Sequence, residues 1–398
     1  MRNSTLAVIL IVVLLVGVGA GYTAGYFANH ASSGKPHVLS VYAAGSLKYV
    51  LGDQFNPSFE NITGIGAGIT FGGSVSNAVQ IKAGAQGDVF ISAAAGVIPQ
   101  YLIPNYTSWM VIFASNEMAI TWTNSSYDIP SSFPFWFENI TAPGVKVAAS
   151  NSSLDPSGFQ AIEMTKLAGI LYTNWSNPYV RMAFNNDESQ FLKYNHAWNS
   201  WFGPNGTLSR EGNGGGYPVN DSLALYDQLF EYDWQVSHDL YITTVEIGLD
   251  NYLTTGSVDY ALTYKSQAIN QHLDFYENPT GGNGLTSWIN LGNISEDQVK
   301  FYSEVNTSGP SESNIGNFEA GPILYAATIL TISKDVGESQ QFLYYLVSNL
   351  GYTDLKSSDF DPIAVPFIYS SSGSIPSFLS GITQPVPSYI PPPSYEQV

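Results

Sequence analysis

The chain has 398 residues, of which 44% are apolar, so its length and composition suit two domains or lobes with packed cores. Only 11% of the residues are charged, and 13 basic against 32 acidic side chains give a formal net charge of -19. Binding to a phosphate backbone needs clustered Lys and Arg, so we expect no nucleic acid partner. Cysteine is absent, which removes disulfides, thiolate metal sites and thiol nucleophiles.

Residues 1–28 predict a membrane anchor or a signal segment. Arg2 precedes an apolar run, and no charged residue follows until Lys35. The stretch 4–28 is long enough to span a bilayer, which takes about 20 residues. Its core at 6–18 also fits a signal peptide, but no clear small-residue cleavage site follows, which favours an uncleaved anchor. Arg2 then places the bulk of the chain outside the cell, after a polar linker at 29–36.

Potential N-glycosylation sites support export. Ten N-x-S/T motifs without an intervening Pro follow the apolar segment, which suggests a glycosylated exterior surface. Their asparagines are Asn61, Asn105, Asn124, Asn139, Asn151, Asn174, Asn205, Asn220, Asn293 and Asn306.

The pattern after the linker alternates between strands and helices, which predicts a parallel α/β sheet. The first three predicted strands are 37–43, 69–71 and 88–92. Two helices open at Gly45-Ser46 and at Gly73-Ser74, and the first is expected to end at Pro57.

The later elements follow the same pattern with one interruption. We expect a strand pair or a crossing strand at 109–123, further strands at 145–148, 258–264 and 323–333, and helices at 155–171, 243–253 and 337–349. Residues 181–240 are aromatic and polar, and we interpret them as an irregular insertion with one helix near 223–230. From Ser370 the chain is rich in Ser and Pro.

Two serines are candidates for anion binding because each opens a predicted helix directly after a strand. Helix N-termini expose unpaired N–H groups and partial positive charge, so Ser46 and Ser74 at two such ends would form an anion pocket without Lys or Arg. Each serine alone is better explained as a helix cap. Their shared Gly-Ser-[Leu/Val] form is what favours a common site.

Three further side chains have both a structural and a functional interpretation. Asp155 precedes Pro156 and is suited to cap a helix, and Thr243-x-x-Glu246 fits a capping box. Spacing alone favours capping for both acids, and a core position for Tyr264. No catalytic nucleophile–base set, P-loop or zinc motif is present, so we do not expect an enzyme.

At these residues the chain resembles the substrate-binding proteins of tungstate/molybdate ABC transporters, in their archaeal branch. The matching segments occur in the family's order and span roughly residues 37–370. They are AAGSL at 43–47, GGSV at 72–75, GDVFISA at 87–93, IPQYLIPNY at 98–106, FASNE at 113–117, DPSGF at 155–159, TVEIGL at 244–249, GSVDYALTYKS at 256–266 and GPILY at 321–325.

The resemblance implies a two-lobed type II periplasmic-binding-protein fold of the α/β class, with an oxyanion held between the lobes. We expect the first lobe at 37–117 with a return segment at 321–378, and the second lobe at 118–320 including the insertion 181–240. A Pro-rich tail is expected at 379–398.

Carried over residue by residue, the resemblance implies an oxyanion site from both lobes. Its expected residues are Gly45, Ser46, Ser74, Asp155, Pro156, Ser157, Glu246 and Tyr264. Family members often have Cys at the position of Ser157. Asp155 and Glu246 would coordinate the W or Mo centre of the ligand, whereas sulfate and phosphate cannot expand their shell in this way.

The implied function is capture of tungstate or molybdate and its delivery to a membrane permease by a monomeric protein, anchored on the extracellular face of the cell membrane and without a cofactor. Two alternatives stay open. One is a receptor for another anion or a metal ion, and the other is a structural cell-surface glycoprotein without a ligand.

Overall fold

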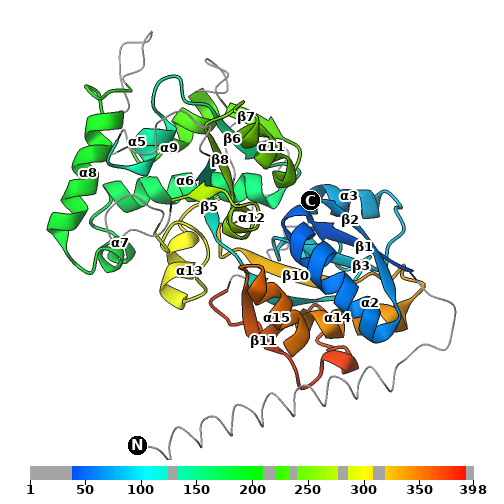
Figure 1. The fold of residues 1–398 in the computed structure, drawn as a ribbon. Coiled ribbons are helices and arrows are strands. Elements are labelled where there is room, and N and C mark those ends of the chain that lie inside the picture. The colour runs from blue at the N-terminus through cyan, green and yellow to red at the C-terminus, as the bar shows by residue number, and fades with distance from the viewer. Residues whose placement is uncertain are drawn as a thin grey trace, which may run out of the picture.

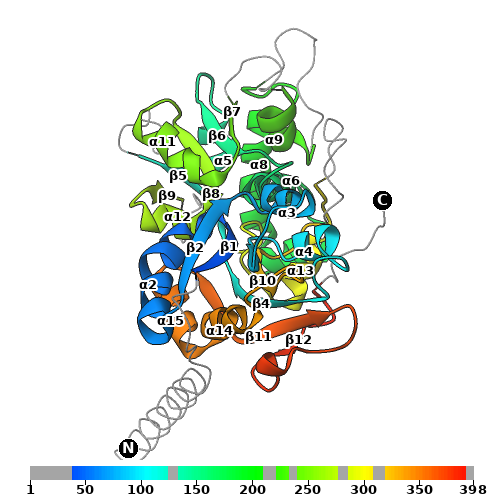
Figure 2. The same ribbon diagram turned by 90° about the vertical axis from the view of Figure 1, so that its right-hand side faces the viewer.

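The computed structural model describes residues 38–123, 133–208, 221–232, 240–276, 286–307 and 319–390. These residues form two lobes, each built around its own β-sheet (Figure 1 and Figure 2). The prediction of a two-lobed α/β fold is confirmed. The predicted anchor and linker lie outside the described residues. Within the described residues, none of the helices has the length and apolar character needed to cross a membrane.

The first lobe has a seven-stranded sheet in the order β12-β11-β4-β10-β3-β1-β2. β1 pairs in parallel with β2 and β3, whereas β10 runs antiparallel to β3 and β4. Its elements are β1 Val38–Ala44, η1 Gly45–Leu47, η2 Val50–Phe55, α2 Asn56–Thr63, β2 Gly66–Gly72, α3 Ser74–Lys82, β3 Val89–Ser92, α4 Val97–Tyr101, β4 Trp109–Ser115, β10 Leu324–Ile329, α14 Val336–Val347, α15 Asn349–Ser357, β11 Asp361–Ser370, η6 Ser377–Leu379 and β12 Gln384–Pro385.

Two apolar cores lie on opposite faces of this sheet, because successive side chains of a strand point to opposite sides. Val89 and Ile91 of β3 belong to the core under α2, α14 and α15. Phe90, between them, belongs to the core under α3 and α4. Both faces of the central strands are therefore buried, which explains their continuous apolar sequence.

The second lobe has a five-stranded sheet in the order β7-β6-β8-β5-β9. β6 is parallel to β7 and β8, and β5 is antiparallel to β8 and β9. Its elements are β5 Met118–Trp122, α5 Trp136–Ile140, β6 Val147–Ser150, α6 Pro156–Thr173, α7 Pro178–Ala183, α8 Glu188–Phe202, α9 Ala224–Tyr226, η4 Asp227–Tyr232, β7 Leu240–Thr243, η5 Glu246–Gly248, α11 Leu249–Thr254, β8 Tyr260–Tyr264, α12 Lys265–Asn270, β9 Asp274–Phe275 and α13 Glu296–Tyr302.

Two chain segments connect the sheets. Asn116 and Glu117 lie between β4 of the first sheet and β5 of the second, and the chain re-enters the first sheet at β10. The segments lie side by side, because the Asn116 N–H donates to the Ile323 carbonyl at 3.3 Å. Residues that are distant in sequence therefore meet between the lobes.

The insertion is more regular than its sequence suggested. Its first part contains α8, a helix of 15 residues, so the prediction of an irregular segment is wrong there. Phe191, Tyr194, Trp198, Trp201 and Phe202 are buried at helical spacing and form the face that packs inward. The predicted helix near 223–230 is present as α9 and η4. The aromatic residues that suggested an irregular segment in the sequence form one buried face of helix α8.

Two predicted helix boundaries are also wrong. Pro57 does not end a helix but lies in the first turn of α2, which continues directly from the wide turn of η2, where the Asn56 N–H bonds to the Leu51 carbonyl. The helix expected from Thr243 begins only after β7, and the Thr243 hydroxyl donates to the Val245 carbonyl at 2.8 Å. The predicted capping box between Thr243 and Glu246 therefore does not form.

Candidate functional site

The first-lobe part of the site begins where β1 ends. Gly45 and Ser46 belong to the short helical turn η1, and no side-chain hydrogen bond caps this turn. The Ser46 hydroxyl is buried and lies 2.8 Å from the hydroxyl of Tyr325. It is therefore held inside the protein at the carboxyl end of a parallel strand, where α/β proteins commonly place their ligands.

Ser74 occupies the first turn of α3, after Gly73 at the N-cap. Its hydroxyl does not cap the helix but accepts the Ala93 N–H at 3.0 Å. The same helix end contacts the second lobe, because the Ser76 N–H donates to the Leu154 carbonyl at 3.1 Å. The N-terminus of α3 thus points its backbone N–H groups at the loop that carries Asp155.

Asp155 is the N-cap of α6, and its Oδ1 accepts the Ser157 N–H at 3.4 Å. Its other oxygen, Oδ2, accepts the Glu246 N–H at 2.7 Å. Pro156 occupies the first helical turn, as predicted from its sequence position. One carboxylate therefore caps α6 and also fixes the start of η5, so capping accounts for part of what Asp155 does.

Glu246 has no such structural explanation. Its side chain is buried, and neither carboxylate oxygen makes a hydrogen bond of good geometry to a described residue, although the Asp155 carboxyl and the Ser46 N–H lie close enough to shift its pKa. The hydroxyl of Ser157 is buried without a partner in the same way. A buried polar group without a partner is costly, so these three oxygens mark a place where a further group is needed.

The two lobes meet at this carboxylate. A Cβ atom added to Gly45 would lie 2.8 Å from Glu246 Oε1 and 2.5 Å from a side-chain carbon of Ile247. Only glycine permits this close approach. Gly45, Ser46, Asp155, Ser157 and Glu246 are thus brought together, although they come from different lobes.

Tyr264 is buried at the end of β8, and its hydroxyl donates to Gln160 Oε1 at 2.7 Å. Its ring centroid lies 6.3 Å from that of Tyr325. The charges of Asp155 and Glu246 help to raise the pKa of Tyr264, after burial as the largest cause. Tyr264 therefore belongs to the same buried region and keeps its proton.

Burial also determines the state of the acids. It raises the pKa of Glu246 well above its ordinary value, and the neighbouring Asp155 raises it further. Burial raises the pKa of Asp155 too, against the lowering effect of its hydrogen bonds. No lysine or arginine of the described chain is among the groups that shift either pKa. The pair is therefore poor at holding two negative charges on its own.

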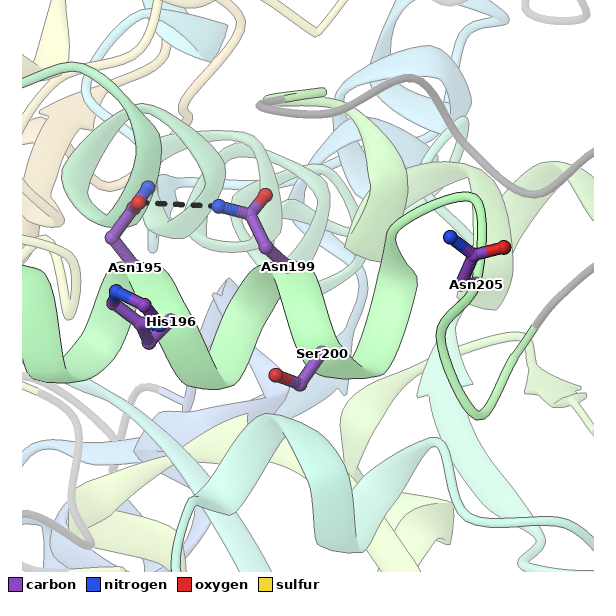
Figure 3. A pocket seen from close by; sticks show the side chains of 5 residues that line it. All are labelled: Asn195, His196, Asn199, Ser200 and Asn205. Carbon is purple, nitrogen blue, oxygen red and sulfur yellow. Dashed lines mark hydrogen bonds between the residues drawn. The ribbon is translucent and has the colours of Figure 1, made fainter.

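A separate cavity lies along α8 in the second lobe, beside the exposed His196 and Ser200 (Figure 3). It measures about 410 Å³ and is lined by Asn195, His196, Asn199, Ser200 and Asn205. Two of these amides are joined, because Asn199 Nδ2 donates to Asn195 Oδ1 at 3.1 Å. The cavity contains none of the predicted site residues.

Known proteins resemble this chain over most of its length. A solute-binding protein of Thermoplasma volcanium is 53% identical over 360 residues, which cover 90% of this chain and 89% of the relative. One from Thermoplasma acidophilum is 48% identical over 379 residues, which cover 92% and 91%. The family model described as "Bacterial extracellular solute-binding protein" matches residues 39–200.

The chain belongs to the solute-binding protein family. It is an extracellular solute-binding protein and not an enzyme. A more distant relative is the molybdate/tungstate-binding protein WtpA of Pyrococcus abyssi. It is 24% identical over 357 residues, covering 87% of this chain and 90% of the relative.

Three polar residues of this solute-binding protein were missed by the sequence reasoning. Asn116, Gln160 and Tyr325 are buried and hydrogen-bonded within the region just described. Asn116 and Tyr325 lie in the segments FASNE and GPILY that carried the family resemblance. Their position in these two motifs could have marked them as site residues. Their contacts could not be predicted, because they depend on how the two connecting segments pack.

The raised acid pKa values predict an unusual pH dependence for the ligand-free solute-binding protein. Between the unfolded value of Glu246, about 4.5, and its higher folded value, the folded state binds more protons than the unfolded state. Stability should therefore rise as the pH falls from 7 toward 5. Glu246→Gln should be more stable than wild type at pH 7, and the difference should shrink with acidification.

Thermal unfolding of wild type and Glu246→Gln across this pH range tests the prediction. The exposed Glu188 of α8 provides a control, because Glu188→Gln leaves the buried pair intact. A wild-type-minus-variant stability difference that does not change between pH 5 and pH 7 would contradict it.

The structure also separates exposed from buried asparagines among the N-glycosylation motifs of this extracellular protein. Asn174, Asn205 and Asn293 are exposed, and the hydroxyl residues two positions after them are exposed as well. Asn139 is fully buried, and its Nδ2 donates to the carbonyls of Phe133 and Phe135. We expect glycans on the first three asparagines and none on Asn139. Glycopeptide mass spectrometry of the native protein checks this, and a glycan on Asn139 would contradict it.

Proposed function

We propose that this solute-binding protein captures tungstate or molybdate between its lobes and delivers it to the membrane permease. The observation that carries the proposal is the buried pair of carboxyl groups of Glu246 and Asp155, for which no lysine or arginine of the described chain acts as a partner. Two adjacent acids without a basic partner are a poor site for an ordinary anion, which they would repel. They suit a ligand whose central atom accepts carboxylate oxygens directly.

Tungstate and molybdate have such a centre. Four oxo ligands with one oxygen each from Asp155 and Glu246 would give a six-coordinate metal. No resident cofactor takes part in this proposal, since the W or Mo centre is the cargo. Coordination would give Glu246 a well-oriented partner, and would hold both acids in their charged form despite burial.

The oxygens of the ligand also need donors. Ser46, Ser74 and Ser157 carry hydroxyl groups that we assign to this role, together with the backbone N–H groups at the start of η1 and α3. Tyr264 would join them by exchanging its hydrogen bond to Gln160 Oε1 for one to the ligand. The Ser157 hydroxyl supports the assignment, because it is buried and without a partner among the described residues. Gly45 and Pro156 would shape the site through their backbone.

The same chemistry predicts selectivity. Sulfur and phosphorus in sulfate and phosphate do not add carboxylate ligands, so the two acids would act on these anions only through repulsion. The acids are therefore attractive for the rare oxyanions and unfavourable for the common ones. The 24% identity with WtpA of Pyrococcus abyssi, which is named for molybdate and tungstate, supports this ligand class.

Calorimetric titration of the full chain with tungstate, molybdate, sulfate and phosphate at pH 7 tests the function. We expect tight binding of the first two and no measurable heat with the others. Preference for sulfate or phosphate would favour a receptor for another anion, and tight binding of a metal cation would favour a cation receptor. The absence of both binding and a ligand-induced thermal shift would favour a structural cell-surface glycoprotein.

The cellular setting belongs to the same proposal. A monomer tethered by residues 1–28 to the outer face of the membrane would remain close to its permease. N-terminal sequencing of the mature protein tests the tether, because a mature N-terminus near residue 30 would indicate a cleaved signal segment. The polar linker 29–36 would then be the start of the secreted chain.

A further inference from the structure

A continuous chain of buried polar groups leads from Ser46 to the second lobe. The Ser46 hydroxyl lies 2.8 Å from the Tyr325 hydroxyl, and Asn116 Nδ2 donates to the Tyr325 oxygen at 3.1 Å. The same amide nitrogen donates to the Ser266 hydroxyl at 2.8 Å. All four residues are buried. The chain of polar groups therefore joins the end of β1, the connecting segment at Asn116, strand β10 and the start of α12.

The orientation of the Asn116 amide is fixed by two backbone groups. Its Oδ1 accepts the N–H of Glu117 at 2.9 Å and the N–H of Ser266 at 3.4 Å. A side-chain amide has its acceptor on one side and its two donor hydrogens on the other. Rotating the amide by 180° would place NH₂ against two N–H groups. The nitrogen must therefore face Tyr325 and Ser266.

This orientation determines the direction of the next hydrogen bond. Because the Tyr325 oxygen receives a hydrogen from Asn116, its own hydrogen is available for Ser46. Burial, as the largest cause, raises the pKa of Tyr325 above its ordinary value, so the phenol keeps that hydrogen. The Ser46 oxygen then accepts from Tyr325. Its own hydrogen is left to point away from Tyr325.

We propose that Asn116 and Tyr325 are positioning residues that orient the Ser46 hydroxyl as a hydrogen-bond donor to an oxygen of the bound anion. The order of donation is amide to phenol to serine to ligand. A site with acidic side chains and no basic partner depends on such donors, because a hydroxyl facing the wrong way would present a lone pair to the anion. The identity of the anion rests on the proposed function, but the orientation of the hydroxyl does not.

Neutron diffraction from the perdeuterated, ligand-free full chain tests the orientation directly. The expected result is a deuteron on the Tyr325 oxygen along the line to Ser46 Oγ, with the Ser46 deuteron pointing elsewhere. A Ser46 deuteron directed at the Tyr325 oxygen would overturn the proposal. This result does not depend on which anion the protein binds.

A double-mutant cycle with tungstate tests the consequence for binding. Tyr325→Phe keeps the ring and removes the hydroxyl, and we expect it to weaken tungstate binding about fivefold to tenfold. Ser46→Ala should weaken it roughly tenfold to a hundredfold. If Tyr325 acts through Ser46, the double variant should bind no more weakly than Ser46→Ala alone. Additive losses would contradict this, because they would indicate two independent contributions.

Tyr345→Phe is the matched control. Tyr345 is a buried tyrosine of α14 whose ring packs on Phe55 and whose hydroxyl donates to Asp354 at 3.3 Å, so it makes no hydrogen bond to Ser46 or Asn116. The control should lose stability to a similar extent as Tyr325→Phe but retain wild-type affinity. An affinity loss as large in the control would overturn the proposal. If wild type binds no tungstate, the proposed ligand fails, and the neutron result alone decides the orientation of Ser46.

Discussion

Glu246→Gln should weaken tungstate binding by roughly a hundredfold and reduce discrimination against sulfate. The substitution keeps the size of a side chain that is buried and makes no hydrogen bond of good geometry to a described residue. An amide oxygen is a poorer ligand than a carboxylate, so the metal centre loses one of its two protein ligands. Hundredfold corresponds to about 2.7 kcal/mol, which is within the cost of losing one strong charged interaction. Sulfate loses a repulsive charge and should bind relatively better.

Calorimetry on wild type, Glu246→Gln and Asp155→Asn provides the measurement. Glu138→Gln is a matched control, because Glu138 is also buried in the second lobe but accepts the Phe135 N–H at 3.1 Å, away from the site. The control should retain wild-type affinity. Equal tungstate affinity in wild type and both site variants would reject coordination by the acids, and helix capping would then be the better account of Asp155.

Gly73→Ala should prevent the lobes from meeting and weaken tungstate binding roughly tenfold to a hundredfold. A Cβ at residue 73 would clash with the backbone carbonyl oxygen of Leu154 and lie 3.2 Å from Asp155 Cβ. A backbone atom cannot move aside as a flexible side chain can, so the lobes must separate, at a cost of about 1–3 kcal/mol. The hydrogen bond from Ser76 to Leu154 would be lost with the contact.

The absence of cysteine allows a change in the distance between the lobes to be measured directly. Val79 of the first lobe and Leu192 of the second are exposed, so cysteines introduced there can carry a pair of dyes without competing thiols. Energy transfer should increase with tungstate in the parent protein and stay low in Gly73→Ala. Gly52→Ala is the control, because nothing lies within 4 Å of the added carbon. Unchanged closure in Gly73→Ala would contradict the prediction.

The extent of sequence-based prediction differs between the fold and the site. Continuous apolar runs such as Val89–Ser92 predict strands buried on both faces, since a parallel sheet is covered on both sides. Asp155 and Pro156 predict the start of α6, because capping is decided by neighbouring residues. The insertion was wrongly predicted to be irregular, because the aromatic residues of α8 are not adjacent in sequence and share one face only when the segment is helical.

The local features of this protein follow from its amino-acid sequence: the strand–helix alternation, the glycine before Ser46 and before Ser74, the small number of basic groups and the absence of thiols. Which of these features act together depends on how the two lobes pack. Asp155 and Glu246 are 91 positions apart, and Ser46 and Tyr325 are 279 positions apart. Their hydrogen bonds form only when two sheets and two connecting segments pack together. A capping pattern depends on adjacent residues, whereas two carboxyl groups become a buried pair only after the rest of the protein has packed around them.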